Sequence, residues 1–140
     1  MVENISKRYI SWEEIDGLII HLADRIKTEM PYIESIVGIE RGGLIPAVML
    51  SHKLGLPLTK SISANTLVVD DICDSGKTLK EGVGVYTAVL FHKPHTSCFT
   101  PSIFAEEYKG DDWIILPWEN KDSEPIQDYL VEHLNYRNRL

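Results

Sequence analysis

The chain has 140 residues, 44% hydrophobic and 25% charged, which are ordinary values for a globular protein. This length allows one domain with a substantial core and is too short for two. The formal net charge of −7 and the lack of a basic block exclude nucleic acid as a bulk partner.

Other features exclude membrane, secreted and zinc-binding classes. No apolar run approaches the length of a membrane span, and the N-terminus lacks the apolar core of a secretory signal. Cys73 and Cys98 form no Cys-x-x-Cys pair, and the five histidines make no metalloprotease pattern, so structural zinc is not expected. A reducing cytoplasm is the expected location.

The first half of the chain predicts helices alternating with strands. Ser11 and Glu14 have the spacing of a capping box, and the apolar residues after them recur at helical spacing, so a helix is expected to end before Pro31. A buried strand over 33–39 and a turn at 40–43 come next. A second helix has Pro46 in its first turn, runs to Leu54 and has Gly55 as its C-terminal cap.

The second half continues this alternation and then becomes irregular. The expected elements are strands at 58–64 and 67–69, a short helix at 76–82 and a strand at 85–91. The aromatic segment 99–118 is expected to be irregular, and 123–135 to form a final amphipathic helix. The pattern predicts an α/β fold with a mainly parallel, twisted sheet flanked by helices, in which ligands gather at the carboxyl ends of the strands.

The most informative segment is 66–79, where an apolar strand leads into Asp70, Asp71 and Asp74 and then into Ser75-Gly76-Lys77-Thr78. Carboxylates at the end of a buried strand need cationic or hydroxyl-rich partners. The small residues that follow leave backbone amides available to phosphate at a helix N-terminus. Gly-Lys-Thr also occurs in Walker A loops, but these need a glycine where this chain has Asp71. The segment therefore predicts a phosphate site beside carboxylates, as a phosphorylated sugar would require.

A second candidate phosphate loop follows the strand at 33–39. Gly42 and Gly43 allow close approach of the backbone to an anion, and Arg41 supplies a forked cationic donor. Alone, a Gly-Gly turn before a helix is more often a structural feature than a phosphate site.

The order of residues in the segment 66–79 resembles the signature of type I phosphoribosyltransferases, and the Arg41-Gly42-Gly43 turn resembles the pyrophosphate loop of the purine-using members. The resemblance implies one phosphoribosyltransferase-like domain over 1–140, with a small C-terminal hood region and hood elements at the termini. It implies that Asp70 and Asp71 bind the ribose of phosphoribosyl pyrophosphate (PRPP) and, directly or through water, Mg²⁺. It further implies that Arg41, Gly42 and Gly43 bind pyrophosphate, that Asp74 to Thr78 (Asp74, Ser75, Gly76, Lys77, Thr78) bind the 5′-phosphate, and that Asp74 is the catalytic base.

The resemblance to the purine-using members extends further along the chain. Lys93-Pro94 resembles their Lys-Pro segment, in which the lysine bonds the exocyclic oxygen of a 6-oxopurine. The segment 113–119 resembles the Trp-Ile-x-x-Pro-Trp-acid segment of xanthine-guanine phosphoribosyltransferases. This implies that Trp113 stacks on the purine and that Ile114 reads its edge through the backbone, whereas Trp118 is expected to belong to the core.

The implied function is phosphoribosyl transfer from PRPP to hypoxanthine, guanine or xanthine in purine salvage, with Mg²⁺, by a homo-oligomer (dimer or tetramer). One departure is that little more than Asn65-Thr66 separates the two strands between which family members carry a mobile lid. An alternative function therefore stays open, that of a catalytically weak regulatory module that binds PRPP or a nucleotide and has lost the lid. Transfer to another nitrogen heterocycle also stays open.

Overall fold

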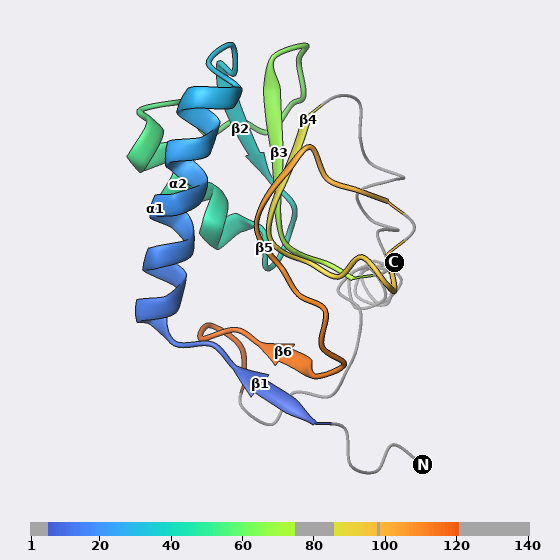
Figure 1. Ribbon diagram of the computed structural model, residues 1–140. Coiled ribbons are helices and arrows are strands. Elements are labelled where there is room, and N and C mark those ends of the chain that lie inside the picture. Colours follow the sequence, from blue (N-terminus) through green and yellow to red (C-terminus); the bar gives the residue numbers. More distant parts are fainter. Residues whose placement is uncertain (1–5, 75–85, 98, 121–140) are drawn as a thin grey trace, which may run out of the picture. The chain divides into compact units, whose positions relative to one another are not determined.

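The computed structural model describes residues 6–74, 86–97 and 99–120 (Figure 1). Its elements in chain order are β1 (Lys7–Tyr9), α1 (Trp12–Glu29), β2 (Ser35–Gly38), α2 (Leu44–Leu54), β3 (Thr66–Cys73), β4 (Tyr86–His92), β5 (Ile103–Glu107) and β6 (Trp113–Ile115). The chain divides into a terminal unit, made of Met1–Asp16 and Gly110–Leu140, and a central unit, Gly17–Lys109.

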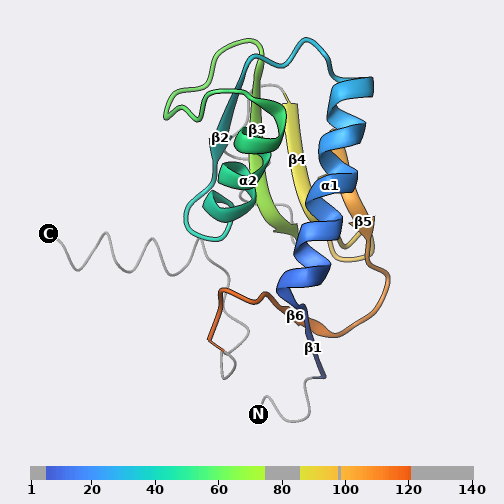
Figure 2. The same cartoon turned by 90° about the vertical axis from the view of Figure 1, so that its left-hand side faces the viewer.

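The central unit contains a four-stranded sheet in the order β2-β3-β4-β5, with every neighbouring pair parallel. The two helices lie on one face of this sheet, α2 over β2 and β3 and α1 over β4 and β5 (Figure 2). The two central strands, β3 and β4, bury most of their residues, as strands covered by crossover connections do. The α/β fold with a parallel sheet flanked by helices is therefore confirmed.

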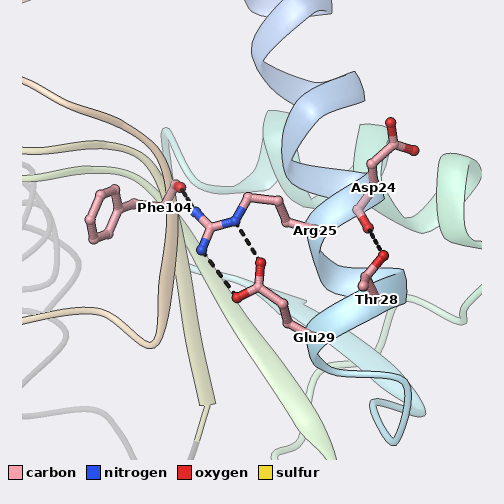
Figure 3. A network of polar contacts seen from close by, with 5 residues as sticks. All are labelled: Asp24, Arg25, Thr28, Glu29 and Phe104. Carbon is pink, nitrogen blue, oxygen red and sulfur yellow. Dashed lines mark hydrogen bonds and ion pairs between the residues drawn. The ribbon is translucent and has the colours of Figure 1, made fainter.

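Polar contacts fix the first helix near both ends, and the contacts at its N-terminus are those that the sequence predicts. At its N-terminus the amide of Glu14 donates to Oγ of Ser11 (3.1 Å), and the amide of Ser11 donates to Oε1 of Glu14 (3.3 Å), which is the predicted capping box. Near its C-terminus, Arg25 donates to both carboxylate oxygens of Glu29 and to the carbonyl of Phe104 in β5 (Figure 3). This carbonyl bond links α1 to the edge strand of the sheet.

The second helix also follows its sequence signals closely. It ends at Leu54, and Gly55 takes the left-handed conformation at φ 66°, which glycine adopts without a Cβ penalty. It begins at Leu44, two residues before Pro46, so the proline still lies within the first turn.

The predicted strand at 58–64 is wrong. Only Leu58 forms an isolated parallel bridge, with Ile36 of β2. Beyond it the backbone turns, because the hydroxyl of Thr66 accepts a bond from the amide of Ser63 (2.8 Å) and so competes with strand pairing. The connection from this bridge to β3 therefore spans 59–65 and is longer than the Asn65-Thr66 link expected from sequence.

Two other predictions of local structure are corrected. The third strand was expected to stop at Val69, but β3 continues through both aspartates to Cys73, where it still pairs with His92 of β4. The segment 99–118, expected to be irregular, contains β5 and β6. Periodicity misses β6 because its partner is β1, a distant segment, in the terminal unit. The expected helices at 76–82 and 123–135 lie outside the described residues.

Candidate functional site

The candidate residues of the central unit come from the carboxyl ends of three neighbouring parallel strands. The turn after β2 carries Arg41, Gly42 and Gly43, β3 carries Asp70 and Asp71 near its end and Asp74 just beyond it, and Lys93 follows β4. Because the strands are parallel, these positions fall at one edge of the sheet. Ser75, Gly76, Lys77 and Thr78 lie outside the described residues.

The glycine turn packs directly against the two aspartates of β3. A Cβ on Gly42 would lie 2.7 Å from Cγ of Asp71 and closer still to its Oδ2. A Cβ on Gly43 would lie 2.5 Å from the carbonyl oxygen of Val69 and 2.9 Å from Cα of Asp70. Position 43 therefore has no room for a side chain beside the backbone, whereas a side chain at position 42 would displace the carboxylate of Asp71. This close approach brings the two predicted loops into contact.

The turn uses part of its own hydrogen-bonding capacity. The amide of Gly43 donates to the carbonyl of Ile39 (2.8 Å), and that of Leu44 donates to the carbonyl of Arg41 (3.1 Å). These two amides are therefore engaged within the turn, and the peptide bond between Glu40 and Arg41 is cis. Arg41 is exposed to solvent, whereas Gly42 and Gly43 are buried.

Asp70 and Asp71 are buried, with 9% and 8% of their surface exposed. Oδ1 of Asp70 accepts a bond from the amide of Asp71 (2.9 Å), and Oδ1 of Asp71 accepts one from the amide of Ile72 (2.8 Å). Bonds from amides to carboxylates favour the charged form of a carboxylate and fix its orientation. The aspartates are thus held in place by the strand that carries them.

Asp74 and Lys93 form an ion pair at the ends of β3 and β4. Oδ2 of Asp74 lies 3.6 Å from Nζ of Lys93, and these side chains are 22% and 6% exposed. The ammonium also lies 5.8 Å from the ring centroid of Tyr108, close enough for a cation–π interaction. On the other side of the carboxylate, Oδ1 lies 2.6 Å from Oγ1 of Thr96.

Thr96 and Tyr108 were not identified from the sequence. A usable signal for Thr96 is the Lys-Pro pair, since proline in the second position of a turn brings the residue two places later back toward the lysine. Tyr108 gives no local signal, because its amide reaches the carbonyl of His92 (2.8 Å) only once β5 has paired with β4.

The predicted base-binding residues Trp113 and Ile114 belong to the terminal unit. There β6 pairs with β1 in parallel, with Trp113 opposite Lys7 and Ile114 opposite Arg8. Trp113 is half-buried, and the side chain of Ile114 is buried in the core, so a role for Ile114 is confined to its backbone. Trp118 packs against Trp12 with ring centroids 5.7 Å apart.

No protein-family model matches the chain. Xanthine-guanine phosphoribosyltransferase of Cereibacter sphaeroides is 28% identical, over 79% of this chain and 86% of that protein. The crystal structure of a purine phosphoribosyltransferase from Pyrococcus horikoshii superposes with a TM-score of 0.72 and 29% identity, over 86% of this chain and 99% of that one. In sequence and in fold, the chain is similar to the type I phosphoribosyltransferases. A xanthine-guanine-hypoxanthine phosphoribosyltransferase of Helicobacter pylori, 19% identical over 95% and 99% of the two chains, shares the fold with a TM-score of 0.70.

The carboxylates of the central unit fit the Mg²⁺ expected from sequence. Magnesium prefers oxygen ligands and is commonly held by one or two carboxylates together with substrate phosphates. Asp70 and Asp71 supply such a pair, whereas no group of three or more His, Cys, Asp or Glu side chains within 6–74, 86–97 and 99–120 could hold a metal. The donor set thus suits an ion that arrives with a diphosphate.

Neither helix of the described part is long and apolar enough to cross a membrane.

Proposed function

We propose that this chain transfers the phosphoribosyl group of PRPP to a 6-oxopurine (hypoxanthine, guanine or xanthine), releasing pyrophosphate and the nucleoside monophosphate. The observation that carries the proposal is the ion pair between Asp74 and Lys93, with Oδ2 and Nζ 3.6 Å apart. A 6-oxopurine presents O6 and N7 side by side on one edge. A neighbouring ammonium and carboxylate match that edge, since the lysine donates to O6 and the carboxylate accepts the proton of N7–H.

The proposed roles of the other residues follow from their positions. The Arg41–Gly42–Gly43 turn binds the leaving pyrophosphate, and the hydroxyls of the ribose are bound by Asp70 and Asp71. Ser75 to Thr78, outside the described residues, are assigned to the 5′-phosphate from the family resemblance alone. Mg²⁺ bound with PRPP would neutralise charge on the diphosphate as it leaves.

The catalytic step assigned to Asp74 is proton removal. The bond between the anomeric carbon and pyrophosphate breaks while a purine nitrogen forms the new bond, and the displaced imidazole proton goes to the carboxylate. General-base assistance of this kind contributes about 10²–10⁴-fold. Trp113 is assigned to stacking on the base, which an indole face does regardless of the ring substituents.

The test is to mix the protein with PRPP, Mg²⁺ and each of guanine, xanthine, hypoxanthine and adenine, and to measure pyrophosphate and nucleotide. We expect product with at least one 6-oxopurine and none with adenine, whose amino group cannot accept from Lys93. Asp74→Asn should lower kcat by about 10²-fold or more and leave PRPP affinity nearly unchanged. No product with any 6-oxopurine would refute catalysis.

A second function, a PRPP- or nucleotide-binding module that turns over slowly or not at all, is favoured by the connection over 59–65. It is longer than expected from sequence, yet much shorter than the mobile lid of family members, which closes the site against water. Binding of PRPP without product formation would support this reading, and rapid turnover would refute it.

A further inference from the structure

The loop after β4 turns back onto Lys93. The amides of Thr96 and Ser97 lie 3.4 Å and 3.1 Å from the carbonyl oxygen of Lys93. Pro94 occupies the second position of this turn, where its fixed φ is favourable. The Lys93-Pro94 pair therefore determines where the side chain of Thr96 lies.

That side chain meets the carboxylate of Asp74. Oγ1 of Thr96 lies 2.6 Å from Oδ1 and 3.1 Å from the backbone carbonyl oxygen of Asp74. A threonine hydroxyl has one proton to donate, and bonds to a carboxylate are shorter and stronger than bonds to a neutral carbonyl. Thr96 thus donates to Oδ1, while Oδ2 is the oxygen directed toward Lys93 at 3.6 Å.

The loop after β4 also contacts Cys73, the last residue of β3 and the one before Asp74. Oγ of Ser97 lies 3.2 Å from Sγ of Cys73, and the amide of Lys93 donates to the carbonyl of Cys73 (2.9 Å). These contacts hold Lys93 and Ser97, which lie on either side of Thr96. Removing the Thr96 hydroxyl would therefore change the orientation of the Asp74 carboxylate without displacing the loop.

We propose that Thr96 is a positioning residue for Asp74 and, through it, for Lys93. The inference rests on the transfer reaction proposed above. The hydroxyl holds Oδ1, so that Oδ2 and Nζ face the purine edge side by side. Without this bond the carboxylate can rotate further toward the ammonium and shorten the 3.6 Å ion pair to a direct hydrogen bond, which would occupy the two groups that the base needs.

The variants are Thr96→Val, which keeps the shape but loses the hydroxyl, and Thr96→Ser, which keeps it. Thr28→Val is the matched control, because it removes a threonine hydroxyl that bonds a helix carbonyl (3.0 Å) away from these residues. We expect Thr96→Val to lower kcat/KM for the purine about tenfold, a fraction of what a general base contributes. Its KM for PRPP should stay unchanged, and Thr96→Ser should restore the purine parameters.

The inference would be overturned if Thr96→Val had the kcat/KM of the wild type for the purine, or if Thr96→Ser lost as much kcat/KM as Thr96→Val. It would also be overturned if Thr96→Val changed only the KM for PRPP. A wild-type protein that forms no product refutes the proposed function instead, and the variants are then compared by calorimetric binding of GMP. Weaker binding by Thr96→Val, restored in Thr96→Ser, supports the positioning role. Equal binding by all variants, or no binding of GMP, overturns it.

Discussion

Substitution of the two glycines in the turn after β2 should have different consequences, although they are adjacent. In Gly43→Ala the new Cβ would lie 2.5 Å from the carbonyl oxygen of Val69 and 2.6 Å from that of Ile39, whereas ordinary contact begins at 3.4 Å. Both atoms belong to backbone joined by the bond from Ile39 N to Val69 O (2.9 Å). Relief would require β2 and β3 to separate. We expect a loss of about 1–3 kcal/mol in the free energy of unfolding, roughly 2–12 °C in Tm.

In Gly42→Ala the three nearest atoms all belong to the carboxylate of Asp71. A side chain can rotate away, so Tm should fall less than in Gly43→Ala. The displaced carboxylate would lose its place beside the turn. If Asp71 binds the ribose or its metal, a lost charged hydrogen bond of about 1.5–3 kcal/mol weakens PRPP binding roughly 10- to 150-fold.

The assays are thermal denaturation without ligand and calorimetric titration with PRPP and Mg²⁺. Gly17→Ala is the control, because a Cβ on this exposed helical glycine meets nothing within 4 Å, and it should stabilise the protein by about 0.5–1 kcal/mol. Gly42→Ala that loses as much Tm as Gly43→Ala while binding PRPP normally would refute the reasoning about Asp71.

Three further predictions concern charge. Lys93→Met should raise KM for a 6-oxopurine about tenfold or more, without changing KM for PRPP, since it removes the donor to O6; equal changes in both would contradict this role. Chelation of Mg²⁺ by EDTA should abolish pyrophosphate release and be reversed by added Mg²⁺, but leave Tm without ligand unchanged; a lower Tm would indicate a structural metal. The hydrogen bond from Arg25 lowers the pKa of Glu29, so its stabilising contribution is complete above the ordinary pKa of glutamate and is lost as pH falls through the lowered value. The Tm difference between wild type and Glu29→Gln should therefore shrink on acidification, and a difference independent of pH would contradict the ion pair.

Sequence reasoning succeeded where the signal was local. The Ser11–Glu14 capping box and the Gly55 cap depend on neighbouring residues, and both appear where they were predicted. The order of strands and helices also sufficed for a parallel sheet, and hence for the edge at which Asp74 and Lys93 meet.

It failed where distant segments decide the outcome. Strand β3 extends past Val69 because β4 offers Phe91 and His92 as partners, which no property of Asp70 or Asp71 suggests. The strand expected at 58–64 shrinks to a bridge because Thr66 takes the amide of Ser63. The contact between Gly42 and Asp71 joins two motifs that read as independent in the sequence.

Because the site forms only when parallel strands pair, ligands of this protein can be identified by their effect on its thermal stability. Gly42 and Asp71, and likewise Asp74 and Lys93, are distant in sequence and become neighbours only through strand pairing, so the unfolded chain has no equivalent site. Mass action then couples occupancy to folding: a ligand at 100 times its Kd stabilises the native state by about 2.7 kcal/mol. Melting the protein against a panel of bases, nucleotides and PRPP would therefore rank its ligands before any reaction product is measured.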